Sequence, residues 1–354
     1  MTHQLAEKLI IWYKKHMRPL PWRVTSDPYK IWLSEIILQQ TRVKQGLPYF
    51  ERFIEKYPDV QALAAAPVDE VLRLWQGLGY YSRARNLHAC AQMIVAEYDG
   101  KFPEDYKGLQ KLTGVGKYTA AAIASFAFHK PVPVVDGNVF RVLSRLFEME
   151  QDIANTKNFQ TFFEASASLL PEKESDLYNQ AMMELGATTC TPSKPACLVC
   201  PIEAFCGAKE KGTQEKYPVK LKKVKVRNRF FYYLVIEYQG QLYLKERGPK
   251  DIWQGLFDFP LHESKNSLSE EEIMEQIEDW THLKKDSFEI EDISAPIKHI
   301  LTHQRIEARF IHLNIHQEWE AEADHGPLSA YSLEEIESLP KPVLVNNYLS
   351  EKFN

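Results

Sequence analysis

Four cysteines just past the middle of the chain constrain its fold more than any other feature. They are Cys190, Cys197, Cys200 and Cys206, separated by six, two and five residues, and the fifth cysteine, Cys90, lies far away. In an intracellular protein, cysteines at this spacing indicate a metal site rather than a disulfide framework. The four thiolates suit either a tetrahedral zinc ion or a cubane iron–sulfur cluster, and their chemistry alone does not separate the two.

Length and composition describe a water-soluble globular protein of two domains. The chain has 354 residues, which is long for a single core, and 26% of them are charged. It has no apolar run of 18 residues and its first residues do not form a secretory signal, so we expect a cytoplasmic protein with no membrane partner. The net charge of −5 argues only weakly against nucleic-acid binding, because local basic stripes matter more than the average.

A glycine-rich segment, Leu112–Ala120, predicts a helix, a tight turn and a second helix. Gly114 and Gly116 allow positive φ angles and a close approach of the backbone. The backbone N–H groups of Val115, Gly116 and Lys117 would then face outward at the start of the second helix, where they could bind a phosphate. An ordinary pair of helices joined by a glycine turn is the alternative interpretation.

Two acidic residues are candidates for acid–base chemistry. Glu35 lies within an apolar segment, Tyr29–Gln45, that we expect to form one helix. If its side chain is buried, its pKa rises, as a general acid requires; otherwise it faces solvent. Asp136 precedes another predicted helix, 20 residues after Gly116. We expect it to stay ionised, because the N–H groups at a helix start favour a carboxylate.

Three polar segments with aromatic residues or arginines could contact nucleic acid. They are Arg18–Arg23, which we expect to be extended, Gln39–Arg42 at a helix end, and Gly77–Arg85 around a glycine turn. Aromatic rings and arginines together suit stacking on bases and phosphate contacts, although each segment could instead be a loop packed on the core. The residues that we expect at this interface are Arg18, Trp22, Arg23, Gln40, Thr41, Leu78, Tyr80 and Arg83.

Helical patterns dominate residues 1–210, and strand patterns begin only after residue 230. Residues 211–229 form a linker whose second part, 216–229, has seven basic residues and no acidic ones. It is either a solvated connection or a segment that follows a phosphate backbone. Residues 230–354 read as an α+β domain, with a hairpin turn at Gln239–Gly240, a helix at Ser269–Asp279 and a strand at Arg305–Ile315.

Taken together, these motifs resemble the endonuclease III superfamily of DNA glycosylases. The cysteine loop follows the glycine turn and its aspartate by about 50 residues, as in that superfamily. Four segments are similar to the MutY adenine glycosylases within it: Leu20–Arg23, Trp32–Thr41, Gly77–Leu87 and Asn179–Ala187. The resemblance implies an all-α helix-hairpin-helix glycosylase domain, 1–210, with a [4Fe–4S] cluster on the four cysteines. It implies that double-stranded DNA contacts Gly114 and Gly116, and that adenine paired with 8-oxoguanine or guanine is removed.

The resemblance also implies roles at the reacting base. Glu35 would protonate N7 of the leaving adenine and position a water molecule. Asp136 would stabilise the oxocarbenium-like sugar and form a covalent adduct with it. Tyr118 and Asn138 would hydrogen-bond near the two carboxyl groups. Two carboxyl groups whose pKa values differ are typical of glycoside hydrolysis, which agrees with these assignments.

Further contacts follow from the same resemblance. Trp22, Arg23 and Gln180 are candidates for contacting an adenine flipped out of the helix, and Gln40 and Tyr80 for wedging the duplex beside 8-oxoguanine.

The second domain, 230–354, resembles the Nudix-like domain of MutY. It lacks the Nudix box, so we expect no pyrophosphatase site. Thr302 and His303 lie where relatives carry an aromatic-Ser-His motif that contacts 8-oxoguanine, and Leu301 replaces the aromatic residue. The alternative is that these are ordinary loop residues before a strand.

One position predicts a monofunctional enzyme. Relatives that also cleave the strand carry a lysine where this chain has Tyr118, and Lys117 should point elsewhere on the helix.

We expect a monomer. Two rival hypotheses are a pyrimidine glycosylase of the endonuclease III type and a DNA-binding module without catalysis that holds a structural zinc ion. The second rival predicts a colourless protein, whereas an iron–sulfur protein is brown.

Overall fold

The computed structural model describes residues 2–221, 225–249, 251–317, 319 and 328–353. The chain forms two compact units: one is Met1–Ala65 with Asn86–Lys222, and the other is Ala66–Arg85 with Lys223–Asn354. Lys222 and Lys223 of the predicted basic linker lie outside the described residues. Within the described parts of the chain, no helix is both long and apolar enough to cross a membrane.

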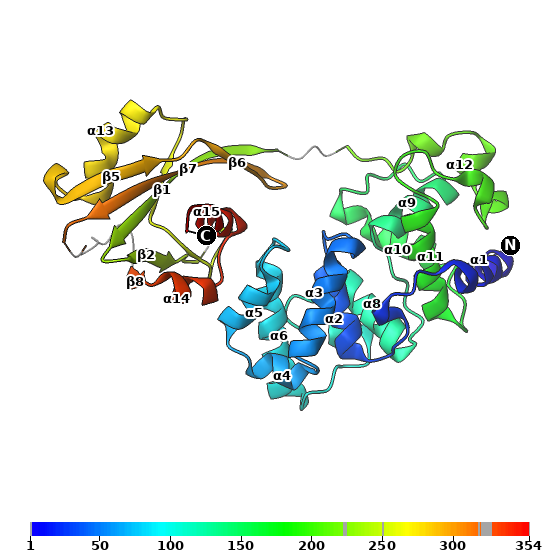
Figure 1. Ribbon diagram of the computed structural model, residues 1–354. Coiled ribbons are helices and arrows are strands. Elements are labelled where there is room, and N and C mark those ends of the chain that lie inside the picture. Colours follow the sequence, from blue (N-terminus) through cyan, green and yellow to red (C-terminus); the bar gives the residue numbers. More distant parts are fainter. Residues whose placement is uncertain (1, 222–224, 250, 318, 320–327, 354) are drawn as a thin grey trace. The chain divides into compact units, whose positions relative to one another are not determined.

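The regular elements of the first unit, as far as it is described, are helices (Figure 1). They are α1 (Thr2–His16), α2 (Pro28–Leu38), α3 (Val43–Lys56), α4 (Val60–Ala65), α6 (Ser82–Tyr98), α7 (Tyr106–Leu109), α8 (Lys117–Phe128), α9 (Gly137–Leu146), α10 (Phe159–Ala167), α11 (Ser175–Thr188) and α12 (Gly207–Glu210), and the first turn of α6 falls in the other unit. The predicted extended conformation of Arg18–Arg23 is wrong in its second half, because Pro21–Arg23 forms a 3-10 turn after an extended Leu20.

The predicted helix Tyr29–Gln45 is wrong in its second half. Asp27 caps α2 by accepting a hydrogen bond from the N–H of Tyr29 (2.9 Å), and the helix ends at Leu38. Gln40 then has a φ of +56°, a left-handed conformation that an α-helix cannot contain, and α3 begins at Val43. The chain therefore turns at Gln39–Arg42, which leaves Gln40 exposed.

Burial of apolar side chains sets how these helices pack. One core cluster includes Leu9 and Tyr13 of α1, Val142 of α9, Phe162 of α10 and Tyr178 of α11. In addition, α2 packs against α8, an alanine-rich helix whose small side chains let α2 approach closely. Helix α8 also packs against α11, so these contacts together fix α2, α8, α9 and α11 relative to one another. The site described below is built on those helices.

The helix-hairpin-helix consists of α7, the glycine turn and α8. Gly114 has a φ of +73°, and a Cβ atom there would lie 2.8 Å from Cβ of Asn86, so the turn requires glycine. Gly116 does not share this conformation, because its φ is −83° and it caps α8. Val115 is also not free to bind a phosphate, because its N–H donates to the carbonyl of Leu112 (3.1 Å).

The second unit combines a mixed sheet with helices. Its elements are α5 (Val68–Trp75), β1 (Arg227–Tyr238), β2 (Gln241–Glu246), β3 (Phe257–Asp258), β4 (Leu261–Ser264), α13 (Glu270–Thr281), β5 (Phe288–Ile293), β6 (Ile297–Ile300), β7 (Gln304–Ile315), β8 (Ser329–Tyr331), α14 (Leu333–Ser338) and α15 (Val343–Phe353). Among the described strands the order is β3-β2-β1-β7-β5, with β4 on β1, β6 on β7 and β8 on β2.

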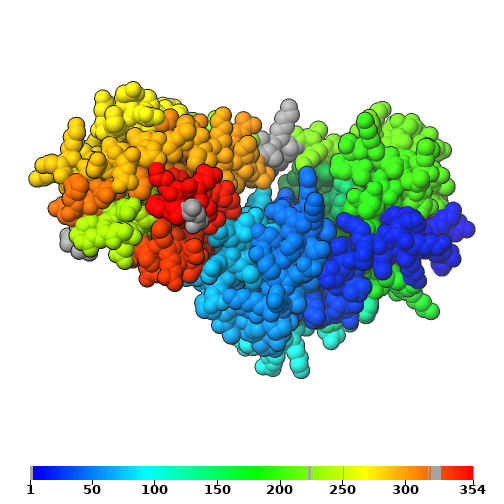
Figure 2. Space-filling model, in the orientation of Figure 1, coloured from blue at the N-terminus to red at the C-terminus, as the bar shows by residue number. Residues whose placement is uncertain are grey.

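The predicted α+β character and the hairpin around Gln239–Gly240 are confirmed, since β1 and β2 pair antiparallel. The long strands β1 and β7 run parallel, with Phe231 opposite Ala308. Helix α13 covers one face of this sheet, where Trp280 packs on Tyr232. Helix α13 lies in the part of the surface that is yellow in Figure 2. Ser269 closes the start of α13 with a capping box.

Candidate active site

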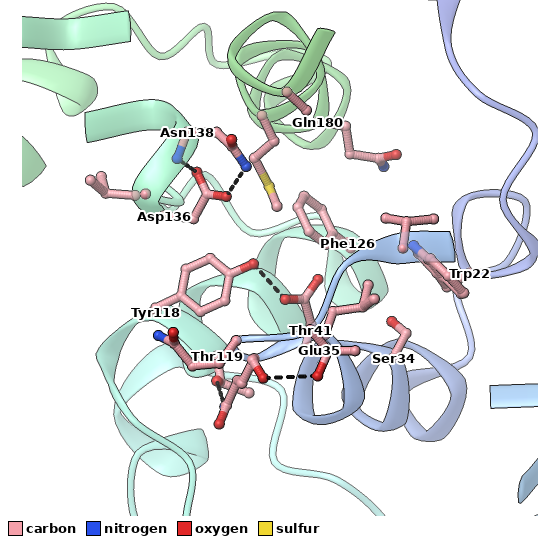
Figure 3. Close-up of a pocket in the computed structure, with 18 of the residues that line it drawn as sticks. Trp22, Ser34, Glu35, Thr41, Tyr118, Thr119, Phe126, Asp136, Asn138 and Gln180 are labelled. Carbon is pink, nitrogen blue, oxygen red and sulfur yellow. Dashed lines mark hydrogen bonds between the residues drawn. The ribbon is translucent and has the colours of Figure 1, made fainter. Parts of the chain in front are cut away.

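A single cleft of about 1230 Å³ lies among α2, α8, α9 and α11 of the first unit. It brings together most of the side chains that the sequence singled out, and Figure 3 shows several of them facing one another. The predicted site residues that line it are Arg18, Trp22, Arg23, Glu35, Gln40, Thr41, Gly114, Gly116, Tyr118, Asp136, Asn138 and Gln180.

Glu35 projects into this cleft from α2 and is buried, with 7% of its surface exposed. The Tyr118 hydroxyl donates a hydrogen bond of 2.5 Å to its Oε2 atom (Figure 3). Burial raises the pKa of Glu35 to about 7, and the hydrogen bond from Tyr118 acts in the opposite direction. A carboxyl group with this pKa retains its proton near neutral pH and can donate it to a bound molecule.

Asp136 caps the start of α9. Its Oδ1 atom accepts hydrogen bonds from the backbone N–H groups of Asn138 (2.9 Å) and Val139 (2.7 Å), and its Oδ2 atom accepts one from the Asn138 side chain (2.7 Å). These bonds favour the ionised carboxylate, as predicted. Burial nevertheless outweighs them and raises the pKa of Asp136 above its ordinary value, a result that the sequence analysis did not foresee.

Arg141 connects this aspartate to the cysteine loop. Its guanidinium donates to Oδ1 of Asn138 (2.9 Å), to the carbonyl of Gly186 (2.5 Å) and to the carbonyl of Cys190 (2.7 Å). Helix α11 approaches α9 closely here, because a Cβ atom on Gly186 would lie 2.6 Å from Cβ of Asn138. Asn138 is therefore held on one side by Asp136 and on the other by Arg141.

Two predicted arginines are engaged by a carboxylate that the sequence analysis missed. Glu184 of α11 is fully buried, and it accepts hydrogen bonds from Arg18 (2.8 and 2.7 Å) and from Arg23 (2.6 Å). These two cations lower the pKa of Glu184 to about 2 despite its burial. The same helix carries Gln180, whose Oε1 atom accepts a hydrogen bond from the Tyr13 hydroxyl (2.6 Å).

The four cysteines lie together around a cavity of about 30 Å³. The Arg145 guanidinium is buried beside them and donates to Sγ of Cys190 (3.2 Å), while the side chain of Gln214 donates to Sγ of Cys197 (3.7 Å). N–H donors aimed at sulfur suit thiolates, so this set fits a metal group held by cysteine. The sulfur atoms are not arranged around a single metal ion, however, because in the described part of the chain no group of three or more His, Cys, Asp or Glu residues is placed to hold one.

The remaining predicted residues lie in the second unit. Leu78 and Arg83 are buried, and Arg83 donates to the carbonyl groups of Leu78 and Gly79 (both 3.2 Å), so it supports the glycine turn from inside. Tyr80 is exposed, and its hydroxyl donates to Oγ1 of Thr302 (2.6 Å).

Thr302 and His303 are both exposed and form the turn of the hairpin between β6 and β7.

The helical and α+β parts each match a known family. Residues 33–166 match the HhH-GPD superfamily of base excision DNA repair proteins, and residues 231–351 match the NUDIX domain. The chain is 36% identical to an adenine DNA glycosylase of Buchnera aphidicola subsp. Acyrthosiphon pisum, over 75% of this chain and 76% of that protein. It is 42% identical to the adenine DNA glycosylase of Homo sapiens, over 59% of this chain and 40% of that protein.

Solved structures agree with this assignment of the helical unit. A thermostable thymine-DNA glycosylase superposes with a TM-score of 0.55 and 29% identity, over 59% of this chain and 97% of that protein. A non-covalent endonuclease III–DNA complex gives a TM-score of 0.51 and 25% identity, over 60% of this chain and 99% of that protein. The chain therefore belongs to the adenine DNA glycosylase family, with a helical HhH-GPD domain followed by a NUDIX domain.

Proposed function

We propose that this enzyme acts on double-stranded DNA and hydrolyses the N-glycosidic bond of an adenine paired with 8-oxoguanine or guanine. One observation carries the proposal: two carboxyl groups, the buried Glu35 and the half-buried Asp136, line the same cleft in different hydrogen-bonding environments. Asp136 accepts three hydrogen bonds and Glu35 accepts one. Asp136 therefore gives up its proton more readily, and Glu35 is the acid.

The reaction uses the two groups in sequence. Glu35 donates its proton to N7 of the adenine, the bond between C1′ and N9 breaks, and the bonding electron pair leaves with the base. The positive charge that develops on the sugar is stabilised by the Asp136 carboxylate, which can form a covalent bond with C1′. Water then adds at C1′, the bond between C1′ and Asp136 breaks with its electron pair returning to the carboxylate, and the water gives its proton to the Glu35 carboxylate, which restores the starting protonation states.

The environment of Tyr118 supports a monofunctional enzyme. Strand cleavage through a Schiff base needs an amine beside C1′, and the side chain between the two carboxyl groups is instead a phenol bonded to Glu35. The ammonium group of Lys117 lies over the ring of Phe159, 5.3 Å from its centroid, although Lys117 also lines the cleft. We infer that the product is an abasic site in an intact strand.

Contacts to the DNA are assigned to the exposed turns. Gly116 and Lys117, at the start of α8, offer backbone N–H groups to a phosphate. Gln40 is exposed on its left-handed turn at the cleft and suits insertion into the duplex. In the second unit, Tyr80 and Thr302 form a hydrogen-bonded pair that presents an aromatic ring and a hydroxyl group. We assign this pair to contacts with 8-oxoguanine.

We further propose that Cys190, Cys197, Cys200 and Cys206 hold a [4Fe–4S] cluster, on the basis of their spacing, their shared cavity and the N–H donors directed at two of the sulfurs. A bound cluster would supply cross-links that fix the loop. The chain's own contribution is Arg145, which also donates to the carbonyl groups of Thr191 (2.8 Å) and Gln214 (2.9 Å) and so ties both ends of the loop to α9.

Single-turnover excision tests this proposal. The substrate is a duplex with one adenine opposite 8-oxoguanine, and the matched control contains an oxidised pyrimidine opposite guanine. We expect strand breakage at the adenine only after treatment with alkali, and none at the pyrimidine. Breakage without alkali would overturn the monofunctional mechanism. Excision of the pyrimidine but not of adenine would overturn the substrate and leave the fold assignment intact.

A further inference from the structure

A buried tyrosine behind the cleft has no part in the mechanism above. Tyr13 of α1 is 1% exposed and does not line the cleft, yet its hydroxyl donates a hydrogen bond of 2.6 Å to Oε1 of Gln180, which does. We propose that Tyr13 is a positioning residue that fixes the orientation of the Gln180 amide and thereby selects a 6-amino purine against a 6-oxo purine. This inference rests on the proposed excision of adenine.

The direction of the hydrogen bond follows from the surroundings of the phenol. A buried hydroxyl proton without an acceptor costs free energy, and Gln180 Oε1 is the acceptor within reach of Tyr13 in the described residues. If the amide were reversed, the Tyr13 hydroxyl would accept from Nε2 and its own proton would have no partner there. The carboxylate of Glu184 cannot replace this acceptor, because each of its two oxygens already accepts two hydrogen bonds from Arg18 and Arg23.

The phenol itself is held in place. The Arg23 guanidinium lies 5.6 Å from the centroid of the Tyr13 ring, and Arg23 is anchored by its hydrogen bond to Glu184 (2.6 Å). The rest of the ring is packed in the core formed by α1, α9, α10 and α11. Tyr13 therefore cannot follow a rotation of the Gln180 amide without disturbing buried groups.

A fixed amide distinguishes purines by hydrogen-bond polarity. Adenine presents a donor, its N6 amino group, next to an acceptor, a ring nitrogen, and a glutamine can pair with both at once. The amide torsion of glutamine is intrinsically soft, so a free side chain could turn over and present its NH₂ group to a 6-oxo group. With Oε1 held by Tyr13, the carbonyl oxygen stays on one side and Nε2 on the other, which disfavours hypoxanthine.

The test compares excision of adenine and hypoxanthine, each placed opposite 8-oxoguanine in the same duplex, under single-turnover conditions. In Tyr13→Phe we expect the ratio of the adenine rate to the hypoxanthine rate to fall by about tenfold, the scale of one hydrogen bond. Tyr178→Phe is the matched control, because Tyr178 lies in the same core cluster and its buried hydroxyl has no hydrogen-bond partner among the described residues. Its ratio should equal that of the wild type.

A second variant separates positioning from general packing. In Gln180→Leu the ratio should also fall, and adding Tyr13→Phe should not change it further. An additional loss in the double variant, or an unchanged ratio in a folded Tyr13→Phe or in Gln180→Leu, would overturn the inference. A wild-type enzyme that excises no adenine would instead overturn the proposed function, and the inference with it.

Discussion

Replacing Glu35 with glutamine should reduce excision to a small residual rate and at the same time stabilise the helical unit at alkaline pH. Burial raises the pKa of Glu35 from its ordinary value of 4.5 to about 7. Because the pKa is raised in the folded state, the stability that Glu35 contributes is complete below pH 4.5 and is lost as the pH rises through 7. The difference between the two pKa values corresponds to a loss of about 3 kcal/mol.

A glutamine at this position carries no such cost, and its Oε1 atom can still accept the hydrogen bond from Tyr118. For a unit of this size, about 3 kcal/mol corresponds to roughly 6–12 °C in the midpoint of thermal unfolding. Scanning calorimetry should therefore show Glu35→Gln melting well above the wild type at pH 8 and close to it at pH 5.

Glu51→Gln is the matched control, since Glu51 is exposed on α3. The midpoint of thermal unfolding of Glu51→Gln should equal that of the wild type at both pH 5 and pH 8. Equal shifts for Glu35→Gln at pH 5 and pH 8, or a lower midpoint at pH 8, would refute the conclusion that burial dominates at Glu35.

Three other changes should have distinct effects. Tyr118→Phe removes a hydrogen bond that lowers the pKa of Glu35, so excision should persist to higher pH, with its alkaline decline displaced upward by about 1–2 pH units; an unchanged pH profile would contradict this role. Gly186→Ala places a Cβ atom 2.6 Å from Cβ of Asn138, so we expect a loss of about 1–3 kcal/mol by denaturant unfolding and excision slowed at least tenfold. Wild-type stability and rate would show that α9 and α11 can separate there. Cys200→Ser should lower the iron content of the purified protein and its broad absorbance near 400 nm, whereas full retention of both would exclude Cys200 as a ligand.

Local patterns in the sequence predicted the parts of the site whose chemistry lies within a few residues. The cysteine spacing, the glycine turn before Tyr118 and the aspartate that begins α9 are all short segments, and the structure places Tyr118 and Asp136 in one cleft. The sequence left open whether Glu35, which lies among apolar residues, is buried or faces solvent, and the structure shows that it is buried.

What the sequence did not reveal depends on partners that are far apart in the chain. Glu184 contacts Arg18 and Arg23 across more than 160 residues, and Tyr13 contacts Gln180 across 167, so no local pattern indicates either pair. The break after α2 was missed for a different reason. The left-handed turn at Gln40 contains no glycine or proline that would mark it in the sequence. Glutamine is also common in helices, so its residue type does not indicate that the helix ends there.

The most direct test of the central claim is the pH dependence of single-turnover adenine excision opposite 8-oxoguanine. If protonated Glu35 is the acid, the rate constant should decline about tenfold per pH unit above pH 7, and the remaining activity of Glu35→Gln should show no such decline. A rate that is constant or rises between pH 7 and pH 9 would contradict the account, because the group that protonates the base would then not be Glu35.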